Sequence, residues 1–291
     1  MTRLLVAGSA GRVGGHVARR LQMAGAPIRR LIQEPAACAA PPDDEIVVGD
    51  YNDAGFMSRA FRSIEAAFMY APDVRSSDAV FRAARDAGVR RIVLLSSASV
   101  SKAPPGENPI AERHRVAENA VKSAGLAFTF IRPDTMASNC LQWAPGIREE
   151  RRVYAAYCHA MRNPIHEDDV ALLAAQALQR EELAAQVFEI TGPEVLTIAD
   201  QVKCIATHLH APLELVPISS EEALDRMIAP PSGMPRLAAQ RLLDYLKKSV
   251  TTAPRVTSDF QSATGQAPRR FNDWVADNLA HFASSTPSSS P

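Results

Sequence analysis

The chain has 291 residues, and its 32 basic and 32 acidic side chains give a formal net charge of zero. Hydrophobic residues make up 46% and charged residues 22% of the sequence, which excludes a globally disordered chain. A neutral chain has no electrostatic footprint for nucleic acid or an anionic membrane surface. No apolar run is long enough to span a bilayer and no signal peptide precedes the first predicted strand, so we expect a soluble cytoplasmic protein.

The first two-thirds of the chain alternates short apolar runs with helical patterns, which is typical of βαβ units. The runs are nearly all apolar, as expected where helices cover both faces of a sheet. We therefore predict an α/β fold with a doubly wound parallel sheet. The predicted strands are Leu4–Ala7, Ile28–Ile32, Glu45–Val48, Ala66–Tyr70, Arg91–Leu95, Phe128–Ile131 and Val187–Thr191, with helices at Gly14–Ala24, Ser76–Ala87 and Glu112–Ala124.

The pattern changes near Pro193, after which helical segments dominate. A breaker run at 229–233, rich in proline, separates two of these segments and predicts a helical hairpin that serves as a lid. The Ser/Pro-rich end of the chain is typical of disorder. The predicted elements are a helix Ile198–Leu209, an extended stretch Leu213–Pro217, helices Glu221–Ile228 and Arg236–Lys247, a last helix from Arg270 and a disordered tail at 283–291.

A glycine-rich turn, Gly8 to Gly15, joins the first strand to the first helix with the spacing GxxGxxG. Glycine permits the tight turn and lets a pyrophosphate approach backbone N–H groups at the start of the helix. With the βαβ units that follow, the turn predicts a Rossmann-type NAD(P)-binding domain at 1–192. The smaller, mostly helical part at 193–282 is then expected to bind the substrate.

The end of the second predicted strand bears on the choice between NAD and NADP. An acidic residue there binds a ribose hydroxyl, whereas a basic residue accepts a 2′-phosphate. Gln33 is neither, and Arg12 or Arg30 could supply the positive charge for NADP. Both cofactors therefore remain open.

Several motifs, in their order and spacing, resemble the NmrA-like atypical short-chain dehydrogenases, in particular the branch of quinone and triphenylmethane reductases. The motifs are Gly8–Gly14, Gly49-Asp50-Tyr51, Tyr70-Ala71-Pro72, Leu95-Ser96-Ser97, Pro109–His114 with Glu118, Thr129–Pro133 with Asn139, Ile165–Asp169 and Thr191-Gly192-Pro193. The resemblance covers the chain up to about residue 282 and implies NADP(H) or NAD(H) as cofactor. It implies cofactor contacts at Gly8, Ser9, Gly11, Arg12, Val13, Gln33, Asp50, Tyr51, Ala71, Pro72, Ser96 and Pro133.

The chain lacks the proton-donating residue that short-chain dehydrogenases usually have. Their usual pattern is a Tyr-x-x-x-Lys pair, in which the lysine lowers the pKa of the tyrosine. None of the five tyrosines has lysine four residues later. The departure leaves two alternatives: a reductase whose acceptor is already activated, or a non-catalytic NmrA-type dinucleotide sensor that signals to a protein partner.

Polar side chains at the predicted strand and helix ends are candidates for the reaction. Ser96 and Ser97 end a strand at the edge where α/β proteins bind ligands, although hydroxyl groups there also cap turns. The ordinary pKa of histidine, near 6.5, would suit His114 as a proton donor, with lining of the substrate pocket as the alternative. The catalytic candidates are Ser96 and His114, and the substrate candidates are Ser97, His114, Met136, Asn139 and Trp143.

No metal site is expected, because the acidic run after His166 is better explained as the start of a helix. The sequence and the resemblance together predict an NAD(P)H-dependent reductase of a carbonyl or quinone in a bulky aromatic compound. An atypical ketoreductase that tailors an aromatic polyketide would be a close analogue within the family. The expected partner is this small-molecule substrate, with no nucleic acid and no membrane.

Overall fold

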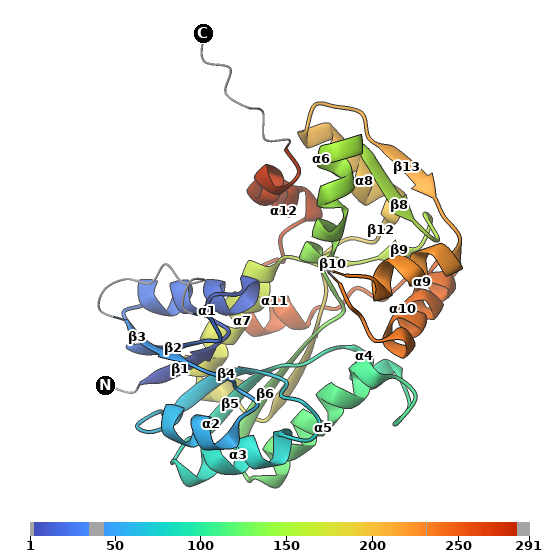
Figure 1. Cartoon of the computed structure of the whole chain (residues 1–291). Coiled ribbons are helices and arrows are strands. Elements are labelled where there is room, and N and C mark those ends of the chain that lie inside the picture. The colour runs from blue at the N-terminus through green and yellow to red at the C-terminus, as the bar shows by residue number, and fades with distance from the viewer. Residues whose placement is uncertain (1–2, 35–43, 231, 284–291) are drawn as a thin grey trace. The chain divides into compact units, whose positions relative to one another are not determined.

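The structure is a computed structural model and describes residues 3–34, 44–230 and 232–283. A seven-stranded sheet, of order β11-β6-β5-β4-β1-β2-β3, forms its largest element (Figure 1). All of its strand pairs are parallel, which confirms the predicted doubly wound α/β fold. The strands are β1 (Leu4–Ala7), β2 (Ile28–Ile32), β3 (Glu45–Val48), β4 (Ala66–Tyr70), β5 (Arg91–Leu95), β6 (Ala127–Pro133) and β11 (Gln186–Ile190).

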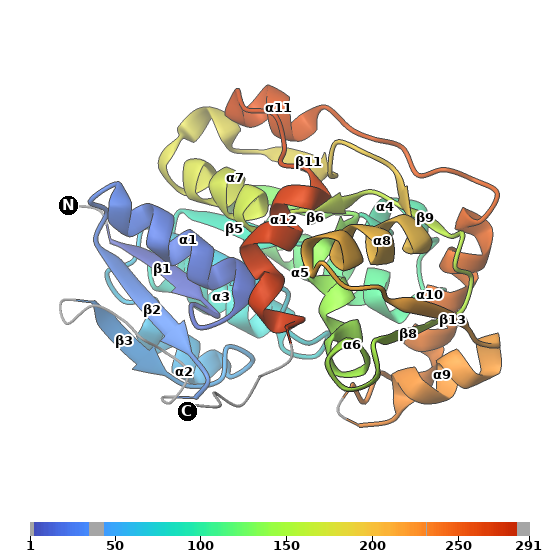
Figure 2. The ribbon, with the colours of Figure 1, turned by 90° about the horizontal axis from the view of Figure 1, so that it is seen from above.

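Helices cover both faces of this sheet, with α1, α7 and α11 on one face and α2, α3 and α5 on the other (Figures 1 and 2). On the second face, Phe61, Phe81 and Phe130 belong to one fully buried apolar cluster. The apolar composition of the strands is explained by this double cover. The helices are α1 (Arg12–Met23), α2 (Ala54–Ala60), α3 (Ser77–Asp86), α5 (Pro109–Ser123), α7 (Glu167–Gln179) and α11 (Asp259–Thr264), and a short helix α4 (Ser99–Lys102) follows β5.

Strand β2 departs from the apolar pattern, because it carries two buried arginines. Arg29 donates to the backbone carbonyls of Ala60, at 2.6 Å, and Arg62, at 2.8 Å. Arg30, on the opposite face of the strand, pairs with Asp44. Arg29 also pairs with Glu45 at 2.8 Å, so both buried charges have an acidic partner, whereas the Nε atom of Arg29 has no hydrogen-bond partner within the described residues.

A second compact unit comprises the segments 135–166, 191–256 and 268–291, insofar as these are described. Its core contains Phe271, Trp274 and Phe282, all essentially buried. Three two-stranded sheets pair β7 with β10, β9 with β12 and β8 with β13. The strands are β7 (Thr135–Met136), β8 (Arg152–Ala155), β9 (Met161–Arg162), β10 (Pro164–Ile165), β12 (Leu196–Thr197) and β13 (Glu214–Pro217), and the helices are α6 (Ala144–Glu150), α8 (Ile198–His208), α9 (Ser220–Ile228), α10 (Arg236–Ser249) and α12 (Phe271–Asn278).

The two compact units are interleaved and do not follow the predicted boundary at residue 192. The first unit comprises 1–134, 167–190 and 257–267, insofar as these are described. Residues 135–166 pack with the second unit, because β7, β8, β9 and β10 form small sheets there. The segment 257–267 belongs to the first unit because α11 packs on α7 and β11. The predicted disordered tail lies almost entirely outside the described residues.

Among residues 3–34, 44–230 and 232–283, no helix combines the length and the apolar character needed to cross a membrane.

An ion pair joins α1 and α7, which lie on the same face of the sheet. Helix α7 begins at Glu167, which confirms that the acidic run after His166 starts a helix. Asp168 in its first turn accepts two hydrogen bonds from Arg20 of α1, both of 2.7 Å. The Asp168 side chain is only 5% exposed. The carboxylate thus compensates the arginine and lies at the positive end of the helix dipole.

We expect Asp168→Asn to lower the free energy of unfolding by about 2 kcal/mol, because a partly buried arginine loses its ionic partner. Urea denaturation monitored by circular dichroism measures this change. Glu222→Gln, which removes an exposed pair with Arg226 on α9, is the matched control and should cost less than about 0.5 kcal/mol. Equal effects of the two substitutions would contradict a special role of the α1–α7 pair.

Candidate active site

The predicted cofactor residues all follow strands of the first unit. Because these strands are parallel, their carboxyl ends meet at one edge of the sheet. The strand order reverses between β1 and β4, and dinucleotides bind at such a reversal. Gly8, Ser9, Gly11, Arg12 and Val13 follow β1, Gln33 follows β2, Asp50 and Tyr51 follow β3, Ala71 and Pro72 follow β4, Ser96 follows β5, and Pro133 ends β6.

The glycine turn has the geometry of an anion site at a helix N-terminus. Gly8 has a φ of +61°, and a Cβ atom on Gly14 would lie 2.3 Å from the carbonyl oxygen of Gly8. The turn therefore requires glycine at both places. Gly11 precedes the first residue of α1 and offers no side chain to cap it. The backbone N–H groups of Arg12 and Val13 donate to no atom of the described residues, so they remain available for an anion.

Tyr70, at the end of β4, supplies the cap that Gly11 lacks. The backbone N–H of Gly14 donates to the phenol oxygen of Tyr70 at 3.1 Å. A Cβ atom on Gly8 would lie 2.6 Å from the Tyr70 ring, so the ring packs directly beneath the turn. Burial raises the pKa of Tyr70, which keeps the phenol protonated. The inner N–H of the first turn is thus satisfied by the protein itself.

The structure distinguishes Arg12 from Arg30, the two arginines considered for a contact with the 2′-phosphate of NADP. Arg30 pairs with Asp44 and donates to Gln22 at 2.6 Å. Its side chain is 6% exposed, so it is wrong as a candidate for a phosphate contact. Arg12 is exposed and has no ion pair or hydrogen bond through its side chain within the described part of the chain. Gln33 is also exposed.

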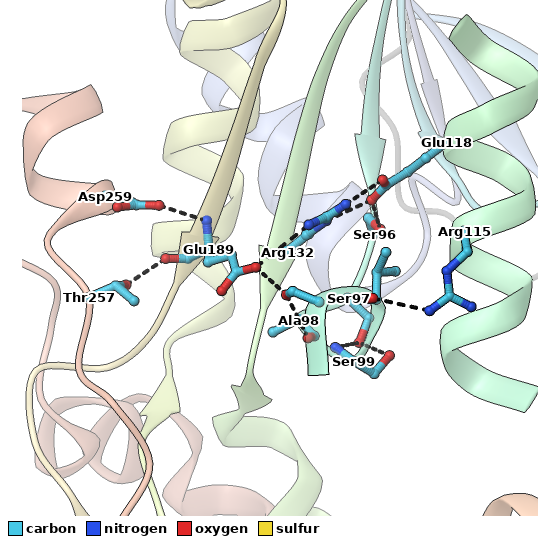
Figure 3. Close-up of polar contacts among 12 residues, drawn as sticks. Ser96, Ser97, Ala98, Ser99, Arg115, Glu118, Arg132, Glu189, Thr257 and Asp259 are labelled. Atoms are coloured by element: carbon cyan, nitrogen blue, oxygen red, sulfur yellow. Dashed lines mark hydrogen bonds and ion pairs between the residues drawn. The ribbon is translucent and has the colours of Figure 1, made fainter. Parts of the chain in front are cut away.

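Ser96 lies in a buried cluster of charged groups (Figure 3). Its hydroxyl group donates to Glu118 of α5 at 2.6 Å. Arg132 of β6 donates to both carboxylate oxygens of Glu118, at 2.8 and 2.6 Å. A guanidinium has donors only, so this two-fold contact selects the ionised carboxylate. The hydroxyl proton of Ser96 is therefore used in the hydrogen bond to Glu118. The hydroxyl oxygen of Ser96 can still accept a hydrogen bond.

Ser97 has the opposite arrangement. Its hydroxyl oxygen accepts from the backbone N–H of Ser99, at 3.2 Å, and from the hydroxyl group of Ser99, at 2.9 Å. The oxygen thus closes the turn into α4, a capping role that hydroxyl groups often have. Within the described residues, no acceptor takes the proton of Ser97. Ser97 can therefore donate a hydrogen bond to a ligand.

His114 lies on α5, one turn before Glu118. Burial and, secondarily, the charge of Arg113 lower its pKa to about 4, although the charge of Glu118 acts in the opposite direction. Its Nδ1 atom is buried and has no hydrogen-bond partner in the described part of the chain. At neutral pH the ring is therefore neutral and is a poor source of a proton, which argues for the substrate-lining alternative.

The remaining substrate candidates lie in the second unit. Met136 is half-buried in β7, which pairs with β10. Trp143 packs at the margin of the apolar core, whereas Asn139 is exposed. The structure thus brings Ser96 and Ser97 together next to α5 in the first unit, and it holds Met136, Asn139 and Trp143 in the other unit. The described residues contain no group of three or more potential metal ligands of the His, Cys, Asp or Glu type.

Two arginines at this edge of the sheet were not predicted from the sequence. Arg132 holds Glu118, as described above. Arg113 donates to the backbone carbonyl of Ala71 at 2.8 Å and so ties the loop after β4 to α5. A charged residue within the apolar run Phe130-Ile131-Arg132 signals a buried ion pair, but the sequence does not name its partner.

A family model described as NAD(P)H-binding matches residues 8–181. The chain is 34% identical over 284 residues to a (4-alkanoyl-5-oxo-2,5-dihydrofuran-3-yl)methyl phosphate reductase of Streptomyces griseus, which covers 96% of this chain and 99% of the relative. It is 27% identical over 295 residues to an NAD(P)H azoreductase of Xenophilus azovorans, with coverage of 96% and 99%.

Solved structures share the fold. The Citrobacter sp. triphenylmethane reductase complexed with NADP(H) matches with a TM-score of 0.77 and 21% identity, covering 95% of this chain and 99% of that one. An Escherichia coli NADPH-dependent quinone oxidoreductase complexed with NADPH matches with a TM-score of 0.78 and 19% identity, at the same coverage. With the family match and the close relative, these findings confirm the resemblance. The chain belongs to the NAD(P)H-binding family, as an NmrA-like atypical short-chain dehydrogenase.

Proposed function

We propose that this NAD(P)H-dependent reductase transfers hydride to the carbonyl or quinone of a bulky aromatic compound, without an acid of the tyrosine–lysine type. The observation that carries the proposal is the direction of the hydrogen bond at Ser96. Its proton is held by Glu118 at 2.6 Å, and the pKa of His114 is lowered to about 4. Neither catalytic candidate is therefore an acid at neutral pH.

The missing acid restricts which acceptors the protein can reduce. Hydride transfer to an isolated ketone produces an alkoxide, which needs a proton donor in the transition state. Hydride transfer to a quinone produces a phenolate-type anion, whose conjugate acid has a pKa near that of tyrosine, about 10. Water can protonate such an anion after the hydride has moved. The protein then contributes chiefly orientation of the two reactants and exclusion of side reactions.

The similar reductases support a conjugated acceptor. Their names specify an azo compound, a triphenylmethane dye and a quinone, and all three classes delocalise the electron pair that hydride delivers. The Streptomyces griseus relative is named for an oxo-dihydrofuran phosphate, which is not aromatic. We therefore expect conjugation to be the essential property of the acceptor, and an aromatic skeleton to be less important.

Ser97 is the hydrogen-bond donor that we assign to the acceptor oxygen. Its oxygen is fixed by two hydrogen bonds from Ser99, so the hydroxyl group is oriented before any ligand arrives. A neutral hydroxyl donor stabilises developing negative charge without transferring its proton. We assign substrate binding to the second unit, which includes the substrate candidates Met136, Asn139 and Trp143, with the hairpin of α9 and α10 as its lid.

Oxidation of NADPH and of NADH, followed by loss of nicotinamide absorbance, tests the proposed reaction. With polycyclic quinones and with ketones hydrogen-bonded to a neighbouring phenol, we expect kcat/KM to exceed that with cyclohexanone by at least about 100-fold, the usual contribution of a general acid. An oxo-dihydrofuran tests the aromatic requirement. An equal kcat/KM with cyclohexanone would show that the protein has a general acid and would contradict the proposal. Tight dinucleotide binding without turnover of any acceptor would favour the dinucleotide sensor.

We expect kcat/KM for a quinone to be independent of pH between about 6 and 8.5, since the lowered pKa of His114 leaves it neutral throughout this range. An inflection near pH 6.5 that disappears in His114→Gln would contradict this assignment.

The same pKa affects stability below neutral pH. The unfolded chain binds a proton at His114 near pH 6.5, whereas the folded chain binds it only near pH 4. The neutral form therefore stabilises the fold above pH 6.5, and this contribution is lost as the pH falls to 4. In urea denaturation, His114→Gln should lose less stability than the natural chain between pH 7 and 4.5.

We expect Arg12 to carry discrimination between the two cofactors, because Arg30 is already paired and Gln33 has no charge. Arg12→Gln should weaken NADPH binding by about tenfold and leave NADH binding unchanged. Arg82→Gln, on the exposed face of α3, is the control. Fluorescence titration with each dinucleotide gives the affinities, and an equal loss for both would place Arg12 away from the 2′-phosphate.

A further inference from the structure

We propose that Glu118 and Arg132 are positioning residues that make Ser96 an obligate hydrogen-bond acceptor for the nicotinamide half of the dinucleotide. The inference rests on the proposed function, because it concerns how the same cofactor is bound. It assigns a role to two residues of the first unit. It also makes the serine after β5 an acceptor of a hydrogen bond from the ligand, where a donor is expected. The ligand group is a hydrogen-bond donor, either a hydroxyl group of the nicotinamide ribose or the carboxamide N–H.

The hydrogen bonds that Glu118 accepts are the first part of the argument. Glu118 is 3% exposed and accepts hydrogen bonds from Ser96 and from two nitrogens of Arg132. Rotation of the Ser96 hydroxyl group towards a ligand would leave the buried carboxylate with one donor fewer. Leaving such a charge under-compensated is costly, whereas accepting a further hydrogen bond at the Ser96 oxygen costs nothing at Glu118.

Arg132 is itself held from both sides (Figure 3). Its second partner is Glu189 of β11, with 3.6 Å between the nitrogen and the carboxylate oxygen. The backbone of Glu189 is fixed in turn: its N–H donates to Asp259 at 2.9 Å, and its carbonyl accepts from Thr257. The alternation of negative, positive and negative groups fixes the orientation of the guanidinium. The segment 257–267 thus contributes to the order of the site.

The strand order places Ser96 on the nicotinamide side. The pyrophosphate belongs at the glycine turn after β1, and the adenosine ribose at the end of β2. The other half of the dinucleotide must then extend in the opposite direction, over β4 and β5. Ser96 follows β5, two strands from β1, which corresponds to about 10 Å at the usual strand spacing. A nicotinamide ribose reaches that far from the pyrophosphate, whereas the adenosine half lies on the other side.

Binding to two ligands tests the proposal without requiring turnover. One ligand is NADPH, and the other is 2′,5′-ADP, which lacks the nicotinamide half. We expect Ser96→Ala to weaken NADPH binding by about five- to tenfold and to leave 2′,5′-ADP binding unchanged. Ser58→Ala, on the exposed side of α2, is the matched control, since Ser58 lies outside this network and should change neither affinity. Calorimetric titration gives all affinities.

A double-mutant cycle tests the positioning role. Glu118→Gln presents an amide in place of the carboxylate, so the Ser96 oxygen is no longer kept free for the ligand. We expect Glu118→Gln to weaken NADPH binding as much as Ser96→Ala does, and the double variant to show no further loss. Additive losses would overturn the positioning role. Circular dichroism checks the fold of each variant, and the comparison of Ser96→Ala with Ser58→Ala decides the issue if Glu118→Gln does not fold.

Further ligands identify the donor. A dinucleotide with an acetyl group in place of the carboxamide keeps the ribose hydroxyl groups but has no amide N–H. If Ser96→Ala still weakens its binding, the donor is a ribose hydroxyl group, and if the effect disappears, the donor is the carboxamide. Equal weakening of NADPH and 2′,5′-ADP, or no effect on either, would overturn the inference. A natural chain that binds neither NADPH nor NADH would instead contradict the proposed function.

Discussion

The buried contact between Glu118 and Arg132 is the interaction on which the proposed chemistry depends. An ionised carboxylate with 3% exposure persists only where donors surround it, and Arg132 supplies two while Ser96 supplies the third. This decides the direction of the hydrogen bond at Ser96. A serine that has given its proton to the protein cannot give it to a substrate. In the proposed reaction, the donor is therefore the adjacent Ser97, whose oxygen accepts two hydrogen bonds from Ser99.

The glycine turn shows a similar division between what the protein satisfies itself and what it leaves to a ligand. The phenol oxygen of Tyr70 accepts a hydrogen bond from the inner N–H group of Gly14. The outer N–H groups of Arg12 and Val13 stay available for an anion. Because Tyr70 packs its ring against Gly8, the same side chain shapes the turn and caps the helix. Any larger residue at Gly8 would collide with the ring.

Much of the fold was predictable because its signals are local. The strands β1 to β5 coincide with the predicted ranges, since each is an apolar run between turn residues. The interleaving of the two units was not predictable, because short strands such as β7 and β10 pair across some 30 residues and have no periodicity of their own. The buried arginines of β2 were likewise hidden, since their partners come from other elements. The order of the motifs was enough to predict that the cofactor candidates follow neighbouring parallel strands. The hydrogen bonding of Ser96 and the protonation of His114 required the positions of neighbouring charges.

In the proposed reaction, the surroundings of α5 take the place of a tyrosine acid. His114 and Glu118 lie one turn apart on this helix. Glu118 is a carboxylate, so it cannot favour an anionic neighbour as the lysine of the usual pair does. It instead orders a serine and an arginine, and burial keeps His114 neutral. Helix α5 therefore positions neutral hydrogen-bonding groups. In the proposed reaction, the acceptor itself must stabilise the negative charge that hydride transfer creates. In the proposed function, this acceptor is a conjugated one.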